Sequence, residues 1–540
     1  IFVEDTLKNA GFQILDVTKI SIVKLPVEIV IATMGNKSFR SCFIESFSTR
    51  KQKTAIKFLR NGEDETVISY PELDRDSNQM ARTFVNLGVQ KGDRVILFLE
   101  KSLIFVSAHI ALQKIGAIAV PLNPGFKKTE MAYLVQDADA KLILLEPEKE
   151  KLIKEIDPTI TSLVIDTKRR YQDLDFFRSA SGECPDIEIR EDDPALIIYT
   201  SGTTGNPKGA VLTQKNLIHD ARNIISIWKI NKNDVLCHSL PLFHVHGMCF
   251  ALHTALISGS TILMLDKFSP EHVTSLLSSR DKKQICTLFM AVPTIYNKLM
   301  EYLGEKRPDF KHIRLWTSGS APLLAKDFEK IHEIFGKEPV EREGMSETGM
   351  NFSNPLKGRR KPGSIGLPLP DLGVRIVNPR TGTDVQPGQT GEIWLKGPSI
   401  TPGYWKKPEE TARSFENGWF RTSDLGKVDE DGYYYLTDRI NHIIISGGEN
   451  ISPKEIEVVI NKLDGVEESS VVGVPDEEWG EKLVAAVVTK ASAPLKFEDI
   501  RAHCRKHLHD WKCPKEIVFV EELPRNTMGK VLKKEVKKFF

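Results

Sequence analysis

The sequence lacks long hydrophobic runs, paired-cysteine motifs and an excess of charge of either sign. No stretch of about 18 consecutive apolar residues occurs, so we expect no helix that spans a membrane. Lysine and arginine together number 74 and aspartate and glutamate 73, which leaves a formal net charge of +1 at pH 7. Such a balance creates no overall field that attracts nucleic acid or an anionic membrane. We therefore expect neither nucleic acid nor an integral membrane as a partner.

The seven cysteines lie far apart, and no C-x-x-C motif is present. An odd, scattered set argues against a disulfide framework or a zinc ribbon and favours a reducing compartment. The first residues lack a basic segment followed by an apolar one, and the last three, Lys538-Phe539-Phe540, match no peroxisomal or prenylation signal. We therefore expect a cytoplasmic protein. The first methionine is Met34, which makes residues 1–37 a candidate N-terminal extension.

Length and patterning predict an α/β protein with two to four domains. Beyond about residue 70, helix-like and strand-like stretches alternate, which predicts a parallel α/β core. Short strands with Gly/Pro turns follow beyond residue 370, and alternating helices and strands follow Arg439. The fold class is therefore a large N-terminal portion of αβαβα-layered subdomains with a small β-rich part, plus a small, mobile α+β C-terminal domain.

Several elements are predicted individually. Ser69-Tyr70-Pro71 opens an amphipathic helix with Met80, Ala81, Phe84 and Leu87 on one side. We expect strands at 374–377, 391–396, 420–422, 432–435, 469–474, 484–489 and 516–520, and helices at 454–463 and 497–507.

The segment Tyr199–Gly209 carries the clearest chemical signal. It follows the apolar stretch 195–198 and combines hydroxyls, glycines and one lysine. Glycines let backbone N–H groups approach phosphate oxygens, hydroxyls donate hydrogen bonds, and Lys208 adds charge. Pro207 and Gly209 flank that lysine, so the loop is not a Walker A motif. The candidate polyphosphate-binding residues are Thr200, Ser201, Gly202, Thr203, Thr204, Gly205 and Lys208.

This loop resembles the phosphate loop of the adenylate-forming superfamily, which includes acyl-CoA synthetases, luciferases and adenylation domains. The likeness covers roughly residues 40–540. Further motifs match in the order that the superfamily has them: 318–323, 344–348, 419–426, 438–439, 446–451 and 523–530.

The resemblance implies ATP, Mg²⁺ and CoA as cofactor and substrates and assigns roles to single residues. Glu347 and Thr204 would hold Mg²⁺, and Thr200, Glu347 and Lys530 would be catalytic. Asp424 would accept the ribose hydroxyls, and Arg439 would bind ribose or phosphate. The remaining nucleotide-side residues are Gly319, Ser320, Ala321, Glu343, Gly344, Met345 and Ser346.

The chain departs from the superfamily pattern at four positions. Glu343 stands where an aromatic residue usually stacks on adenine, and Ser423 replaces a glycine. Asp438 also stands where glycine is more usual. Asn441 occupies the usual hinge position, and asparagine tolerates unusual backbone angles there.

The resemblance also implies that the chain is divided into domains with different functions. An adenylation domain would cover residues 38–438, a hinge 439–442 and a lid domain 443–540. Ser446, Gly447 and Gly448 would line the pantetheine tunnel in a second, thioester-forming orientation. The reaction would be an AMP-forming, two-step acid–CoA ligation, performed by a monomer or a homodimer.

Several segments look most like malonyl-CoA synthetases, in which an arginine clamps the second carboxylate. Arg314 matches that position, which predicts malonate or methylmalonate as the acid. The alternative is that Arg314 lies at the start of a strand and is paired with a surface acid. His244, Ser318 and Met345 complete the predicted acyl pocket. His244 and His246 would lie on one strand face without a third ligand, which disfavours a metal site.

Other readings of the function stay open. A medium-chain or aromatic acid could replace malonate in the same family. The chain could instead load a carrier protein, or be an inactive nucleotide-binding homologue, which Glu343 favours.

Overall fold

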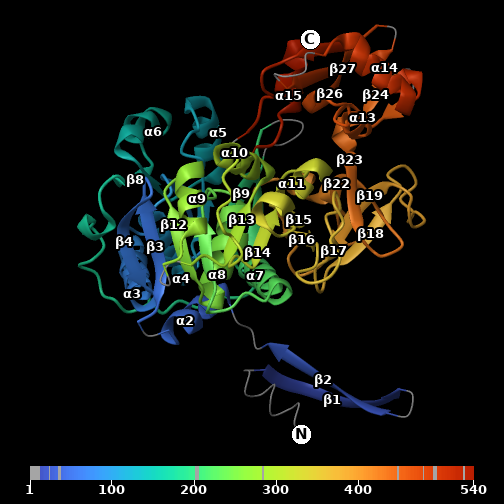
Figure 1. Cartoon of the computed structure of the whole chain (residues 1–540). Helices are drawn as coiled ribbons and strands as arrows, with labels where there is room; N and C mark the ends of the chain where they lie inside the picture. Colours follow the sequence, from blue (N-terminus) through green and yellow to red (C-terminus); the bar gives the residue numbers. More distant parts are fainter. Residues whose placement is uncertain are drawn as a thin grey trace. The chain divides into compact units, whose positions relative to one another are not determined.

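The computed structural model describes residues 12–22, 25–34, 38–50, 52–200, 206–281, 285–446, 449–477, 479–490, 495–526 and 529–540 (Figure 1). The chain divides into two compact units. Unit 1 comprises Ile1–Thr54, Ile68–Ile197 and Leu212–His219, and unit 2 comprises Ala55–Val67, Ile198–Val211 and Asp220–Phe540. The division passes within β9 (Pro194–Thr200), β10 (Lys208–Thr213) and α7 (Gln214–Trp228). The boundaries at 38–438, 439–442 and 443–540 concern a functional division and stay a prediction.

Unit 1 contains a parallel sheet in the order β9-β6-β5-β7-β8. Its central strands are short and, apart from Arg94 at the start of β5, apolar, because both faces of such a sheet are covered by helices. The further strands are β5 (Arg94–Phe98), β6 (Ile118–Pro121), β7 (Leu142–Leu145) and β8 (Thr161–Val164). The helices are α2 (Phe39–Ser48), α3 (Tyr70–Asn86), α4 (Leu103–Ile115), α5 (Lys128–Ala138) and α6 (Glu150–Ile156).

Helix α3 shows how local sequence sets an element. The Ser69 hydroxyl accepts from the Glu72 N–H, and the Glu72 carboxylate accepts from the Ser69 N–H at 2.8 Å, which is a capping box. Met80, Ala81 and Phe84 are fully buried, as predicted. The prediction for Leu87 is wrong: it follows the last helical residue, Asn86, and is 41% exposed.

Ahead of α2, β1 (Phe12–Ile22) and β2 (Leu25–Met34) pair as an antiparallel hairpin. The hairpin lies within the candidate N-terminal extension.

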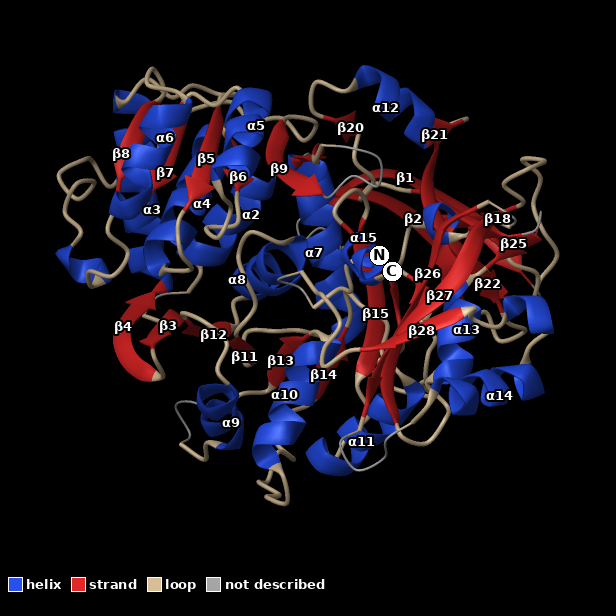
Figure 2. Ribbon diagram, turned by 90° about the horizontal axis from the view of Figure 1, so that it is seen from above, coloured by secondary structure: helices blue, strands red, loops and turns tan. Residues whose placement is uncertain are grey.

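Unit 2 contains a larger sheet in the order β17-β16-β15-β14-β13-β11-β12-β3-β4, and Figure 2 shows the row from β4 to β15. Neighbours from β3 to β15 run parallel, and β15, β16 and β17 run antiparallel. The carboxyl ends of parallel strands share one edge of a sheet, where ligand-binding residues gather in open α/β sheets. The strands are β3 (Thr54–Arg60), β4 (Glu63–Ser69), β11 (Val235–His238), β12 (Thr261–Leu265), β13 (Leu288–Ala291), β14 (Leu315–Ser318), β15 (Val340–Met345), β16 (Gly349–Ser353) and β17 (Leu367–Pro368).

The helices between these strands include a π-helical segment, η3 (His246–His253), and π-helical turns are frequent at functional sites. The α-helices are α8 (Thr254–Ser258), α9 (Pro270–Ser278), α10 (Pro293–Leu303) and α11 (Ala325–Phe335).

A β-rich part follows, in the order β18-β19-β22-β21, with β23 paired to β22. It confirms the short strands predicted beyond residue 370. Its elements are β18 (Gly373–Val377), β19 (Gly391–Lys396), α12 (Pro408–Ser414), β21 (Phe415–Glu416), β22 (Trp419–Val428) and β23 (Tyr434–Arg439). A short strand, β20 (Gly403–Tyr404), pairs with β10.

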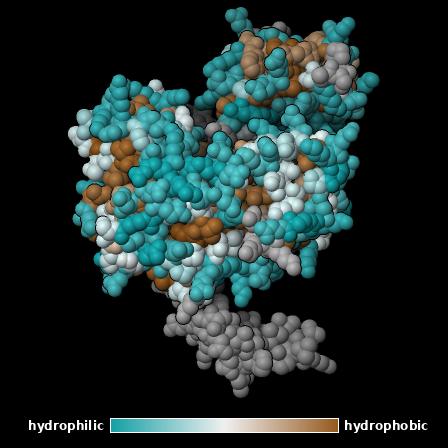
Figure 3. Space-filling view, turned by 60° about the vertical axis from the view of Figure 1, so that its left-hand side comes forward, coloured by the Kyte–Doolittle hydropathy of each residue, from teal (hydrophilic) through white to brown (hydrophobic). Residues whose placement is uncertain are grey.

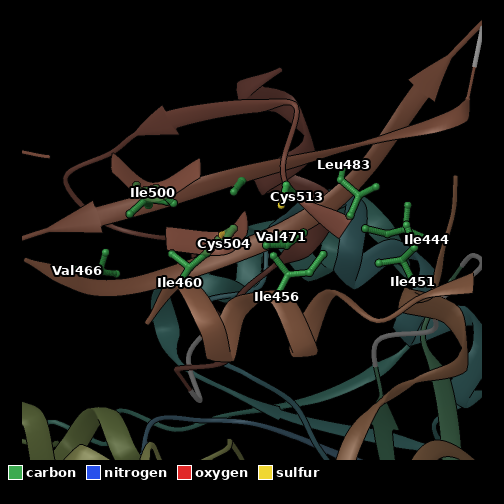
Figure 4. Close-up of a cluster of buried hydrophobic side chains, with 12 residues drawn as sticks. Ile444, Ile451, Ile456, Ile460, Val466, Val471, Leu483, Ile500, Cys504 and Cys513 are labelled. Atoms are coloured by element: carbon green, nitrogen blue, oxygen red, sulfur yellow. The ribbon is translucent and has the colours of Figure 1, made fainter. Parts of the chain in front are cut away.

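The last hundred or so residues form the order β25-β24-β27-β26, with β28 paired to β27. Helices α13 and α14 cover this sheet over a core of isoleucines, valines and two cysteines, Cys504 and Cys513 (Figure 4). The elements are β24 (Ile444–Ser446), β25 (Glu449–Ile451), α13 (Pro453–Ile460), β26 (Val466–Asp476), β27 (Gly480–Thr489), α14 (Phe497–His507), β28 (Glu516–Phe519) and α15 (Lys533–Val536). The predicted α/β class with a small C-terminal α+β part is confirmed.

Hydrophilic side chains dominate the face drawn in Figure 3, with scattered apolar patches. Within the described ranges, no helix combines the length and the apolar character needed to cross a bilayer.

Candidate active site

Glu347 and Thr200 meet within unit 2, although 147 positions separate them in the chain. The Thr200 hydroxyl lies 3.4 Å from Glu347 Oε1, and the Tyr404 hydroxyl donates to the same oxygen at 3.1 Å. Burial raises the pKa of Glu347 above its usual range. A buried carboxylate beside two hydroxyls is an oxygen-rich environment that fits Mg²⁺, which typically takes one carboxylate plus substrate phosphates.

The phosphate loop is described at its two ends. Thr200 ends β9 and Lys208 begins β10, and the Thr200 hydroxyl lies 3.4 Å from the Lys208 carbonyl oxygen. Lys208 Nζ lies 5.4 Å from the centre of the Tyr404 ring, so the lysine and Glu347 share a neighbour. Five predicted loop residues and two predicted tunnel residues lie outside the described residues: Ser201, Gly202, Thr203, Thr204, Gly205, Gly447 and Gly448. Ser446, the remaining tunnel candidate, is buried on β24.

Asp424 and Arg439 face each other across the antiparallel pair β22–β23. Arg439 Nε donates to Asp424 Oδ1 at 2.6 Å, and a second guanidinium nitrogen lies 3.3 Å from Oδ2. The Asp424 charge raises the pKa of Arg439 further, so this cation persists at any physiological pH. The structure therefore brings together the two residues predicted for the ribose.

Lys530 lies near the same group of residues. Its backbone N–H donates to Asn526 Oδ1 at 2.9 Å, and its carbonyl accepts from the Asn526 N–H at 2.9 Å. Surrounding protein, and then the Arg439 charge, lower the pKa of Lys530 to about 8, while Asp424 and Glu347 oppose the shift. Lys530 thus lies close enough to Arg439, Asp424 and Glu347 for their charges to shift its pKa. A lysine that contacts both nucleotide and acid must lie in such a position.

The acyl-side candidates come from the turn just before η3 and from the ends of β14 and β15; His244 and His246 therefore do not lie on a strand as predicted. Ser318 ends β14, is buried, and has a hydroxyl without a partner in the described part of the chain. Ser320 Oγ lies 3.2 Å from His246 Nδ1. Burial lowers the pKa of His244 to about 4 and that of His246 well below its usual range, so both rings are neutral at pH 7.

A buried guanidinium that the sequence analysis did not select lies beside these residues. Arg342 on β15 is 2% exposed, and none of its three side-chain nitrogens has a hydrogen-bond partner among the described residues. The guanidinium carbon lies 4.9 Å from the centre of the Phe250 ring on η3. A Cβ placed on Gly319 would lie 2.6 Å from Arg342 Nε, so only glycine leaves room for the guanidinium.

Arg342 stays charged in this apolar setting. Burial lowers its pKa to about 10, with Glu343 and Asp220 opposing the shift. Asp220, on α7, is itself buried, and its Oδ1 accepts from the Met350 N–H at 2.8 Å. A buried cation without a hydrogen-bonded partner is costly, so an anion bound beside Arg342 would lower that cost.

Arg314, predicted to clamp the second carboxylate, is fully engaged elsewhere. Its Nε and one terminal nitrogen each donate to Asp234 at 2.7 Å. The other donors reach the carbonyl oxygens of Trp228 and Lys229 at 2.9 and 3.0 Å. Burial raises the pKa of Asp234, but the hydrogen bonds, led by that from Arg314, bring it below its usual range. Arg314 thus forms a structural ion pair, as the alternative has it, but with a buried acid rather than a surface one.

Arg314→Leu is therefore expected to lower stability and leave acid preference unchanged. The substitution strands the carboxylate of Asp234, which is 4% exposed, and losing one partner of a buried pair costs about 3 kcal/mol. Thermal unfolding measures the first effect, and relative kcat/KM for malonate and butyrate measures the second. A variant of unchanged stability that gains butyrate activity would restore Arg314 as the clamp.

Glu343 lies on β15 next to the Asp424–Arg439 pair. Its Oε2 accepts from Asn351 Nδ2 at 3.0 Å. Gly344, Met345 and Ser346 follow it in a partly exposed row, and Gly319, Ser320 and Ala321 follow β14. The nucleotide-side candidates of the sequence analysis therefore lie on neighbouring strand ends of one sheet.

Two departures from the superfamily pattern have visible structural effects. Ser423 has φ +59°, in the left-handed region that glycine adopts without strain, and its N–H donates to Glu392 Oε1 at 3.1 Å. Asp438 accepts from the Ser452 hydroxyl at 2.5 Å and from the Lys454 N–H at 3.0 Å, and so binds the first turn of α13.

Sequence signals existed for the residues that were missed. Arg342 is a charge inside a short strand that leads directly into the Gly344-Met345-Ser346-Glu347 motif. Tyr404 stands beside another aromatic residue, Trp405, directly after Gly403. Nothing local marks Asp220, which matters only through tertiary contacts.

Known families match both parts of the chain. Residues 43–405 match the AMP-binding enzyme family, and residues 455–530 match the AMP-binding enzyme C-terminal domain. A mitochondrial malonate–CoA ligase, ACSF3 of Mus musculus, is 36% identical over 510 residues, covering 87% of this chain and 86% of that protein. A long-chain-fatty-acid–CoA ligase of Bacillus subtilis is 32% identical over 540 residues, covering 93% and 94%.

Solved structures of CoA ligases are also similar to this chain. The ATP-bound crystal structure of MatB from Rhodopseudomonas palustris superposes with a TM-score of 0.87 at 36% identity, covering 93% of this chain and 99% of that one. The o-succinylbenzoate CoA synthetase MenE of Bacillus subtilis, in complex with its acyl-adenylate, gives 0.80 at 28% identity, covering 93% and 98%. The chain therefore belongs to the AMP-binding enzyme family, which confirms the predicted adenylate-forming superfamily and the predicted class of acyl-CoA ligases.

Proposed function

We propose that this chain converts a short dicarboxylic acid, malonate or methylmalonate, into its CoA thioester with ATP, releasing AMP and pyrophosphate. The observation that carries the choice of acid is Arg342: a buried, charged guanidinium with no hydrogen-bond partner among the described residues. A second carboxylate on the substrate is the anion that this position lacks. A monocarboxylate of similar size would leave the charge buried and without a hydrogen-bonded partner.

The reaction divides between the residues described above. In the first step an acid oxygen attacks the α-phosphorus of ATP, and pyrophosphate leaves. Lys530, Lys208 and the hydroxyl of Thr200 offset the negative charge that gathers when carboxylate and triphosphate meet. Asp424 and Arg439 hold the ribose. In the second step the CoA thiol displaces AMP from the acyl carbon.

Glu347 would hold Mg²⁺, together with Thr204 and phosphate oxygens, and the ion would neutralise phosphate charge. Its buried, hydroxyl-lined carboxylate fits that role.

Neutral histidines suit the acyl side. His246 Nε2 is buried without a partner in the described part of the chain, and Ser318 Oγ is likewise unpartnered. Both lie among the groups around Arg342, because Gly319, between Ser318 and Ser320, packs against its guanidinium. A short acid can thus find hydrogen bonds at one end and a cation at the other. The ligase relatives that act on malonate support this choice of acid, whereas a long apolar chain would meet a charge.

Three finer points are part of the proposal: residues 443–540 rotate about 439–442 between the two steps, the protein is a monomer or a homodimer, and it acts in the cytoplasm.

An ATP–pyrophosphate exchange panel tests the proposal directly. Malonate and methylmalonate are expected to support exchange, and butyrate, hexanoate and benzoate less than about a tenth of that rate, because a mispaired charge costs on the order of 2–5 kcal/mol. With CoA added, nucleotide analysis should show AMP. A preference for hexanoate or benzoate would overturn the choice of acid, and ADP as product would overturn the ligase reaction.

A further inference from the structure

Glu343 is an acid without a cation of its own. In the part of the chain that the structure describes it forms no ion pair, and its one hydrogen bond comes from the neutral amide of Asn351. The charged groups that face it are Arg342 on its own strand, Asp424 on β22 and Arg439 on β23. Arg439 already donates twice to Asp424, and Arg342, whose charge lowers the pKa of Glu343 more than that of Arg439 does, forms no hydrogen bond with it.

We propose that Glu343 links nucleotide binding to the uptake of one proton, so that its carboxyl is neutral whenever ATP is bound. The inference rests on the proposed function, because it takes the group around Asp424 and Arg439 as the nucleotide site. The proton comes from solvent and stays on the carboxyl oxygen; no other bond changes.

Two physical effects lead to this coupling. ATP brings several negative charges toward a carboxylate that Asp424 already repels, and a bound nucleotide removes water from the partly exposed Glu343 side chain. Both effects disfavour the ionised form. Asn351 is compatible with either form: its amide nitrogen can donate to a carboxylate, and its Oδ1, which has no partner among the described residues, can accept from a protonated carboxyl.

The free protein is already poised for the change. Burial first, and then the Asp424 charge, raise the pKa of Glu343 to about 7, while Asn351, Arg342 and Arg439 oppose the shift. A further rise on binding means that the complex holds more protons than the free protein above pH 7. ATP affinity should then fall with rising pH, by up to about tenfold per unit while one proton is taken up.

Isothermal titration calorimetry of ATP binding, without acid or CoA, tests the coupling. Titrations in two buffers of different ionisation enthalpy give the number of protons taken up between pH 7 and 9. Lys530, with a pKa of about 8, contributes to this number in every variant. The matched control is therefore Glu343→Gln, which keeps the shape and the acceptor for Asn351 but cannot ionise.

The wild-type protein should take up more protons than Glu343→Gln, and its affinity should fall more steeply with pH. Glu343→Tyr, which installs the aromatic residue of the superfamily, should share the shallow slope of Glu343→Gln and bind ATP about tenfold more tightly by stacking on the base. If the wild-type protein takes up the same number of protons as whichever of Glu343→Gln and Glu343→Tyr folds, the coupling is overturned. The ligase proposal would still stand. A wild-type protein that binds no ATP at any pH would overturn both.

Discussion

Arg342→Met is expected to reduce kcat/KM for malonate by roughly a hundred- to a thousandfold. That loss lies within the range of about 2–5 kcal/mol expected when one partner of a buried charge pair is removed. Butyrate, which lacks the second carboxylate, should become a better substrate than in the wild type, because no buried charge is then left uncompensated. Exchange rates for both acids, measured with wild type and variant, give the discrimination.

The stability of Arg342→Met should change in the opposite direction to its activity. Methionine fills a similar volume without a charge, and replacing a buried ion by a packed apolar side chain is commonly stabilising. The unfolding temperature should therefore rise, whereas Arg314→Leu should lower it. A variant that keeps malonate selectivity would contradict the assignment of Arg342, and a less stable one would show that Arg342 has a structural role instead.

Lys530→Ala is expected to abolish adenylation, with a loss of about a thousandfold or more in pyrophosphate exchange, and to spare thioester formation from a supplied acyl-adenylate. The lysine lies beside Asp424, Arg439 and Glu347 in the orientation described, where the α-phosphate would be attacked. Electrostatic stabilisation of this kind typically contributes 2.7–4 kcal/mol or more per donor, roughly a hundred- to a thousandfold. Lys534→Ala is the matched control, since that side chain is exposed on α15.

The pH profile provides a second readout for Lys530. A lysine works here as a cation, and its pKa is lowered to about 8, so the charge is present below pH 8 and is lost above it. Exchange should decline as pH rises through 8 in the wild type, and any residual rate of Lys530→Ala should lack that step. Equal loss of both half-reactions would contradict the proposed rotation of residues 443–540.

Local signals predicted most elements and most of the nucleotide side. Helix α14 and strand β19 have the predicted bounds, because a capped amphipathic helix and a short buried strand that begins at a glycine are both set by neighbouring residues. The structure brings Thr200 and Glu347 together, and the sequence pointed to both because the chemistry predicted for them requires particular residue types in short motifs.

The acyl side could not be predicted in the same way. Arg314 and Arg342 both precede a superfamily motif, and the sequence does not show which of them has a partner. Asp234 lies 80 positions from Arg314, and only the packing of β14 against β13 and the segment before β11 brings the two together. Two residues so far apart in the chain leave no periodic pattern in the sequence that would reveal their pairing. For the same reason the sequence could not show that Glu343 forms no ion pair among the described residues.

The contact that Asp438 makes with α13 bears on the rate of the second half-reaction. Its carboxylate lies at the end of β23 and holds the Ser452 hydroxyl and the Lys454 N–H, on the far side of the 439–442 segment. If residues 443–540 rotate about that segment as proposed, both hydrogen bonds would break, each worth roughly 1.5–3 kcal/mol when one partner is charged. A glycine at this position would offer no such resistance. Under that proposal, Asp438 would slow the rotation and lengthen the lifetime of the acyl-adenylate before CoA reaches it.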